Sequence, residues 1–252
     1  MKKHVGMAGF LLTLAACTSV PPPRVMPEAG VSPEAAWATV LSQHVDDRGR
    51  IDFTGVAARP RDLEAFIAWI ATTSPAKDPE AFPTKEARLA YWLNAYNALA
   101  MYNVIRSGIP TELGSIKVRF FGLTTFTIGG QSMSLNTLET KVVRPIGDPR
   151  VHFALNCMVR GCPRLPRSPF ATSRLEEQLE AAAKLFLNEE RNVGLLPDRS
   201  TERFSDILRF YTGDFLKHAP SLAAYANRYR ESEIPTGWKE EFIPYDWVVN
   251  RQ

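Results

Sequence analysis

The segment from Lys85 to Arg106, KEARLAYWLNAYNALAMYNVIR, constrains the fold of this chain more than any other segment. Its bulky apolar side chains recur at spacings of three and four residues, which is typical of an α-helix. They are Leu89, Trp92, Leu93, Tyr96, Leu99 and Ala100. Because they cover a wide stripe, we expect a helix that is buried on most of its sides. The rest of the chain must supply elements that pack around it.

Shorter helical patterns flank this helix. They cover about residues 33–44, 62–71, 135–143, 173–187, 205–217 and 221–230. Ser32 before Pro33 is typical of a helix start. Ser134 is predicted to cap the helix after it, and Ser173 with Glu176 has the spacing of a capping box.

Three short segments have the composition of strands, namely residues 116–121 (IKVRFF), 125–128 (TFTI) and 151–155 (VHFAL). They are rich in β-branched and aromatic residues, and the last alternates in a way that fits an interior strand. Residues 242–247 (FIPYDW) are also expected to be extended. The sum predicts an α+β fold, a mostly helical single domain with a small central β-sheet.

The N-terminus reads MKKHVGMAGFLLTLAAC, a positive start, an apolar run and small residues directly before Cys17. This order is typical of a bacterial secretory signal and resembles a lipobox. We expect residues 1–16 to be removed as a signal peptide and Cys17 to carry lipid. An ordinary cleaved signal beside an unrelated cysteine is the alternative. The apolar run is too short to span a bilayer, and no later stretch reaches the roughly 20 apolar residues that a span needs.

Residues 17–33 comprise the lipidated cysteine and a proline-rich tether, and residues 34–252 form a single globular domain on this interpretation. Thr18 follows the cysteine where inner-membrane lipoproteins often carry Asp, so we expect attachment to the outer membrane, facing the periplasm. The membrane is then one partner, through the anchor, and an unidentified periplasmic or cell-wall ligand is another. The net charge is only +3 and there is no basic run, which gives no reason to expect nucleic acid.

Residues 152–165, HFALNCMVRGCPRL, hold one of the four histidines and two of the three cysteines. If residues 151–155 form a strand, His152 and Asn156 point to the same side of it. Cys157 and Cys162 are four residues apart, and disulfides persist in exported proteins, so a structural or labile disulfide is one interpretation.

A catalytic thiol is the other interpretation of this segment. Gly161 and Pro163 would expose Cys162 on a tight turn, and a nearby His152 imidazolium would lower the pKa of its thiol. Three ligands for a metal are also present, but their spacing matches no zinc signature, and the cysteines do not form a Cys-X-X-Cys redox motif. No phosphate-binding loop is found either, so no cofactor is predicted.

Three further polar residues are candidates for a site. Asn94 and Asn97 share a face of the long helix and lie among bulky apolar residues, where an amide must be hydrogen-bonded. They either tie down neighbouring backbone or orient a group in a cleft. Glu139 is a possible partner of His152, although an acid on a solvated helix face is the plainer interpretation.

Five segments of the chain resemble, in order, those of the family called domain of unknown function number 547. They are YWLNAYNAL (91–99), GGQSMSLNTLETKVVRP (129–145), DPRVHFALNCMVRGCPRL (148–165), ILRFYTGDF (207–215) and IPYDWVVN (243–250). The resemblance runs from about Trp37 to Asn250. It implies that the candidate residues named above occupy motif positions of the family. Met158 and Arg160 depart from the usual form, in which a small residue and Ser are common.

Two functions follow as hypotheses. The first is an envelope enzyme for thiol-dependent acyl transfer or amide hydrolysis, with Cys162 as nucleophile, His152 as base, and Asn156 or Glu139 orienting the imidazole. The second is a noncatalytic binding or scaffold lipoprotein, in which a structural or redox Cys157–Cys162 disulfide holds a recognition loop.

Overall fold

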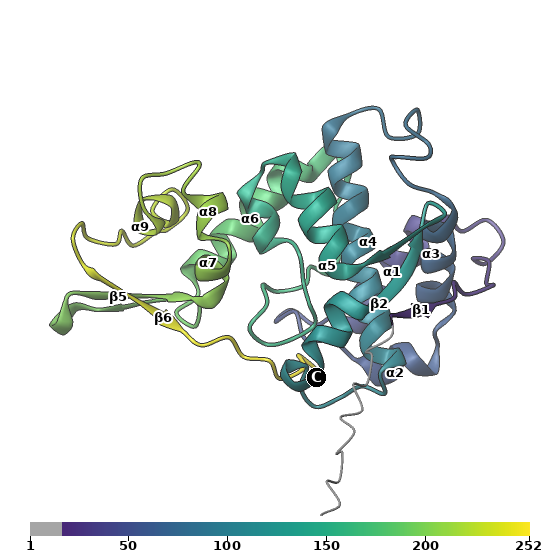
Figure 1. Cartoon of the computed structure of the whole chain (residues 1–252), viewed down its shortest axis with the longest axis horizontal. Helices are drawn as coiled ribbons and strands as arrows, with labels where there is room; N and C mark the ends of the chain where they lie inside the picture. Colours follow the sequence, from purple (N-terminus) through teal and green to yellow (C-terminus); the bar gives the residue numbers. More distant parts are fainter. Residues whose placement is uncertain (1–16) are drawn as a thin grey trace, which may run out of the picture.

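The computed structural model describes residues 17–252, and the long helix α4, Lys85–Arg106, forms the centre of its larger lobe (Figure 1). The predicted signal peptide, residues 1–16, lies outside the described residues. The side chain of Thr84 accepts a hydrogen bond from the backbone N–H of Ala87 and so caps the helix. Fifteen of its 22 residues are buried, and it packs against α2, α3, α5 and α6, as the wide apolar stripe predicts.

The remaining helices are short, and several are linked by 3₁₀ or π turns. They are α1 Pro33–His44, α2 Phe53–Ala58, α3 Arg61–Thr72, α5 Leu135–Thr137, α6 Leu175–Asn188, α7 Asp206–Phe210, α8 Thr212–Phe215 and α9 Leu222–Ala226. The strands are β1 Thr18–Val20, β2 Thr124–Ile128, β3 Gln131–Ser134, β4 Val193–Leu196, β5 Thr201–Ser205 and β6 Lys239–Ile243. The predicted α+β class is confirmed.

The described part of the chain has two small sheets rather than one central sheet. In one, β2 pairs with β1 in parallel and with β3 antiparallel. In the other, β5 pairs antiparallel with β4 and parallel with β6. Figure 1 places the first sheet with α1 to α5 and the second with α7 to α9, and α6 lies between the two groups. Each of the two lobes therefore contains one of the sheets.

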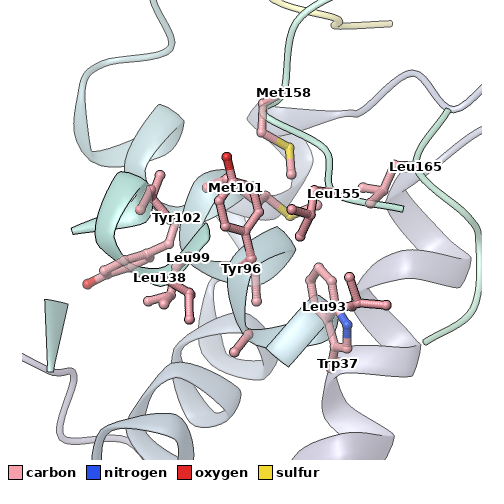
Figure 2. Close-up of a cluster of buried hydrophobic side chains, with 14 of the residues drawn as sticks. Trp37, Leu93, Tyr96, Leu99, Met101, Tyr102, Leu138, Leu155, Met158 and Leu165 are labelled. Atoms are coloured by element: carbon pink, nitrogen blue, oxygen red, sulfur yellow. The ribbon is translucent and has the colours of Figure 1, made fainter. Parts of the chain in front are cut away.

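Two hydrophobic clusters correspond to these lobes. The larger surrounds α4, and Figure 2 shows Trp37 of α1 and Leu138 close to side chains of α4, together with Leu155 and Met158 from a later loop. The smaller is built on stacked aromatic rings, with Phe153 between Phe186 and Phe215. The segment after β6 returns from the second lobe to the first, and this crossing shapes the site described below (Figure 1).

Two of the predicted strands are wrong. Residues 116–121 lie in a 3₁₀ turn and a π-helix, Val118–Leu123, and residues 151–155 lie mainly in a 3₁₀ helix, Pro149–Phe153. In the second case the Asp148 carboxylate accepts a hydrogen bond from the Arg150 N–H at 3.0 Å, and Pro149 occupies the first turn. An acidic cap followed by proline favours a helical start over a strand. The strand at 125–128 is confirmed.

The capping box is also wrong, because Glu176 has another partner. Its carboxylate pairs with Arg150 at 2.6 Å instead of reaching back to the helix start. Helix α6 begins at Leu175 after a 3₁₀ turn without a side-chain cap. The helix expected over 205–217 is divided at Tyr211 into α7 and α8, while the cap at Ser134 is confirmed by its hydrogen bond from the Thr137 N–H at 3.1 Å.

The N-terminal residues 18–20 are docked on the domain, where a tether was expected to begin. They form β1, in register with Thr124 to Phe126 of β2, and Val20 is buried. Cys17, directly before β1, is exposed and its thiol is free. Within the described residues, no helix is both long enough and apolar enough to cross a bilayer.

Candidate functional site

A cleft of about 290 Å³ opens where the two lobes meet. Each of the five segments that carry the family resemblance contributes to its lining. The contributors include Tyr96, Glu139, His152, Tyr211 and Tyr245, one from each segment in order. Residues that are up to about 150 positions apart in the sequence therefore face one hollow, which makes it the candidate site of the molecule.

His152 lines this cleft and is buried, and its ring is held on two sides. Its ring stacks on Tyr211 with centroids 3.8 Å apart and an interplanar angle of 13°. Its Nε2 lies 3.1 Å from Oδ2 of Asp214. Burial lowers the pKa of His152 to about 4, although Asp214 acts in the opposite direction. The imidazole is therefore neutral near pH 7, and its Nε2–H donates to Asp214.

Asp214 is the anion of this group. Its Oδ2 accepts from Arg144 Nε at 2.8 Å, and its Oδ1 accepts from Lys217 Nζ at 2.9 Å. Partial burial acts to raise the pKa of Asp214, but the hydrogen bonds from Arg144, Lys217 and His152 outweigh it and hold that pKa well below its usual range. The carboxylate of Asp214 is therefore charged and paired with three donors. It fixes the orientation of the His152 ring, and the imidazole stays neutral.

Glu139 has the opposite environment. It projects from the π-helix Leu138–Val143 into the cleft, and burial raises its pKa. The nearby hydroxyl groups of Tyr211 and Tyr96 and the charge of Arg144 act against this pKa shift without cancelling it. The neutral form of this carboxyl is therefore more favoured in the cleft, among aromatic side chains, than it is in water.

Cys157 and Cys162 are joined by a disulfide with Cα atoms 6.2 Å apart. Cys157 is half-buried and lines the cleft, whereas Cys162 is only 2% exposed and is not among the described residues that line it. The hydroxyl of Tyr245 lies 3.0 Å from Sγ of Cys157 and 3.1 Å from Sγ of Cys162. The Cys157 N–H also donates to Sγ of Cys162 at 3.0 Å.

The predicted exposure of Cys162 on a tight turn is wrong, and the C-terminal segment is the reason. The N–H of Gly161 donates to the carbonyl of Asp246 at 2.9 Å, so the turn is paired with the returning chain. A Cβ added at Gly161 would lie 2.9 Å from the ring of Tyr245. The glycine permits this close approach, which covers the turn instead of exposing it.

Residues 80–187 match the family model described as "Protein of unknown function, DUF547". These residues of the chain belong to the DUF547 family. No curated protein and no solved structure matches the chain. The matched DUF547 residues include Glu139, His152 and both cysteines, whereas Tyr211, Asp214 and Tyr245 come from the sequence after it.

Asn94 and Asn97, the two candidate asparagines of the long helix, form hydrogen bonds with backbone groups of neighbouring loops. Asn97 donates to the carbonyl of Ala154 at 3.0 Å and accepts from the N–H of Asn156 at 2.7 Å. Asn94 accepts from the Trp37 indole at 3.3 Å and from the Phe170 N–H at 3.0 Å. Both amides therefore fix loops against α4, in the way a buried amide requires.

Asn156 and His152 do not point to the same side of a strand, because residues 151–155 do not form the predicted strand. Its Nδ2 donates to the carbonyl of Pro163 at 2.6 Å, and its Oδ1 accepts from the Met158 N–H at 2.7 Å. It closes the disulfide loop from inside. Of the two predicted partners of the imidazole, neither binds it, because Asp214 occupies that position while Glu139 faces the tyrosines.

The sequence-based prediction missed four residues of the candidate site, namely Arg144, Tyr211, Asp214 and Tyr245. All four lie in segments that carry the family resemblance. That resemblance was the signal that could have found them, since nothing in their own spacing points to the histidine or the cysteines. Among residues 17–252 there is no group of three His, Cys, Asp or Glu side chains placed to hold a metal ion.

Proposed function

We propose that this chain is a thiol–disulfide exchange protein of the bacterial cell envelope, which acts on a small thiol bound in the cleft. One observation carries the proposal: the disulfide forms part of the cleft wall with one sulfur reachable and the other buried. In such an arrangement an incoming thiolate meets Cys157 and Cys162 is the leaving sulfur.

The exchange proceeds in two balanced steps. In the first, the thiolate of the ligand attacks Sγ of Cys157, the Cys157–Cys162 bond breaks, and its electron pair leaves on Cys162. In the second, a further thiolate attacks the ligand sulfur of the mixed disulfide and releases Cys157, so the two ligand molecules are oxidised and the pair is reduced. Two donors face the leaving sulfur, the Cys157 N–H and the Tyr245 hydroxyl. Burial raises the pKa of Tyr245, so its hydroxyl keeps its proton and can donate it in a hydrogen bond.

The charges around the cleft suit a thiolate. Burial raises the pKa of Glu139 and so disfavours its negative charge, and His152 is neutral near pH 7. Arg144 lines the cleft, pairs with Asp214 through Nε and is 31% exposed. Its guanidinium is therefore available to an anionic group of the ligand, while the aromatic rings of Tyr96 and Trp247 offer apolar contact.

The thiol-dependent acyl transfer expected from the sequence stays a prediction. It needs a reduced pair and an accessible Cys162, whereas exchange begins from the oxidised pair seen here. The noncatalytic alternative needs a disulfide that no small thiol can reduce in the folded protein. One set of variants distinguishes thiol–disulfide exchange, acyl transfer and a noncatalytic role.

The experiment uses the full chain with Cys17→Ser, which removes the remaining thiol, and compares Cys162→Ser with Cys157→Ser. Glutathione disulfide is the probe, and intact mass reports mixed-disulfide formation. We expect the Cys162→Ser variant to form the adduct at least about tenfold faster, because its remaining thiol lines the cleft. Equal rates, or faster reaction at Cys162, would overturn the proposal, as would a parent disulfide that resists dithiothreitol until the protein unfolds.

The envelope location rests on the signal-like N-terminus and on the exposed Cys17 that follows it. Metabolic labelling with palmitate in a bacterial host tests it. We expect label in the parent chain and none in Cys17→Ser, and an unlabelled parent chain would contradict the lipoprotein assignment.

A further inference from the structure

A second hollow, of about 580 Å³, shares Tyr245 with the cleft and is lined by the outer part of the disulfide loop. Its most unusual feature is its charge. Five arginines line it: Arg48, Arg50, Arg160, Arg164 and Arg191. We call this hollow the arginine basin.

The carboxylates around the arginine basin do not neutralise it. Arg50 pairs with Asp46 at 2.7 Å, while Arg164 and Arg191 share the single carboxylate of Glu189. Within residues 17–252, the side chains of Arg48 and Arg160 make no ion pair, and both residues are exposed. The lining itself contains one acid, Asp246, whose carboxylate accepts the Val248 N–H at 2.9 Å.

The chain holds these arginines together by contacts between distant segments. Arg191 donates from Nη1 to the carbonyl of Arg160 at 2.7 Å. The Arg160 N–H donates to the carbonyl of Val248 at 2.8 Å, and Asn250 donates to the carbonyl of Gly49, beside Arg48 and Arg50, at 3.0 Å. Three parts of the sequence therefore bring guanidinium groups to one hollow, held by contacts with a fourth, although like charges at close range repel.

We propose that the arginine basin binds a phosphate-bearing ligand. Guanidinium groups match the tetrahedral oxygens of phosphate through paired N–H donors, and several around one hollow favour a ligand with more than one negative charge. The volume exceeds that of a single phosphate, so the ligand carries a second phosphate or an organic body. A free phosphate ester and the headgroup of an anionic phospholipid share this chemistry.

Pyrophosphate, titrated into the full chain with Cys17→Ser by calorimetry, is the first probe. We expect saturable binding that weakens as salt is added and that falls at least about tenfold in Arg48→Ala/Arg160→Ala. Both side chains are exposed and unpaired within the described residues, so this variant keeps its fold, which a thermal melt verifies. The matched control is Arg24→Ala/Arg119→Ala, which removes two exposed arginines outside the basin and should change affinity less than about twofold.

Flotation with vesicles distinguishes the two sources of phosphate. Binding to phosphatidylglycerol vesicles but not to phosphatidylcholine vesicles, lost in Arg48→Ala/Arg160→Ala and kept in the control, supports the lipid headgroup. Pyrophosphate binding without vesicle binding supports a free phosphate ester. The inference is overturned if neither probe binds, or if the control variant loses as much affinity as the basin variant.

Discussion

The cleft and the arginine basin share Tyr245 but differ in how their ionisable side chains are exposed to water. In the cleft, His152 is buried and Glu139 is half-buried, and burial moves the pKa of each in the direction that favours the neutral form. In the basin, the side chains of Arg50, Arg164 and Arg191 are one-third to nearly one-half exposed and stay charged. Burial sets protonation on one side of the disulfide loop, and water supports permanent charge on the other. Proton concentration should therefore act on the cleft and salt on the basin.

The largest expected effect is the pH dependence that His152 gives to stability. Its pKa falls from about 6.5 in the unfolded chain to about 4 in the fold, so the unfolded chain binds more protons between these values. Stability is therefore complete above about pH 6.5 and falls by about 3 kcal/mol as the pH drops through 4. Urea unfolding across this range measures the loss.

His152→Gln should remove most of this slope, whereas His218→Gln, which alters an exposed histidine, should keep it. A His152→Gln variant with the slope of the parent chain would show that another group causes the acid sensitivity.

The second effect concerns the disulfide loop, which is held from both sides. Asn97→Ala leaves the carbonyl of Ala154 and the N–H of Asn156 buried without partners, which should cost about 2 to 3 kcal/mol. Arg191→Ala removes contacts on the exposed basin side and should cost about 1 kcal/mol or less. Denaturant melts at neutral pH compare the two, and a larger loss for Arg191→Ala would reverse the assignment of the rigid side.

A smaller effect, on the order of 1 kcal/mol, is expected from Glu139→Gln. Because the folded pKa of Glu139 is raised, the unfolded chain binds fewer protons above its own pKa, and the parent loses stability as pH rises. Glutamine cannot ionise, so the variant should gain on the parent as the pH rises above the ordinary glutamate pKa of about 4.5. An advantage that stays constant over this range would mean that Glu139 is charged throughout.

The smallest effect on stability belongs to the basin. Arg48→Ala/Arg160→Ala should change the unfolding free energy by less than about 0.5 kcal/mol at physiological salt, and equally at pH 5 and pH 8. At low salt the variant should be slightly more stable than the parent, because it lacks the repulsion between the two removed arginines and the other charges of the basin. A large loss at any salt concentration would mean that these side chains hold the fold, contrary to their exposure.

The helices around the core could be predicted because their signals are local. Ser32, Thr84 and Ser134 each cap a helix within three residues, and the spacing of Leu89, Trp92 and Tyr96 is a property of one segment. The segment at 151–155 shows the limit of such reasoning. Three alternating apolar residues fit a strand, yet Asp148 and Pro149 just before them start a helical turn, and the short pattern cannot decide between the two.

The site could be predicted only in part, because its pairs are set by tertiary packing. His152 and the cysteines are drawn to attention by their own chemistry, but the partner of His152 is 62 residues away and the hydroxyl beside Cys157 is 88 residues away. No spacing rule spans such separations. The covering of Cys162 depends on a C-terminal segment whose path only the assembled fold determines.

Strand β1 begins one residue after Cys17, and an extended residue spans only about 3.3 Å. A lipid on that thiol would thus attach almost directly to the edge of the first sheet, and the prolines that follow would lie beyond the attachment point rather than before it. The body of the protein would then be held close to the bilayer surface, instead of moving at the end of a long flexible tether.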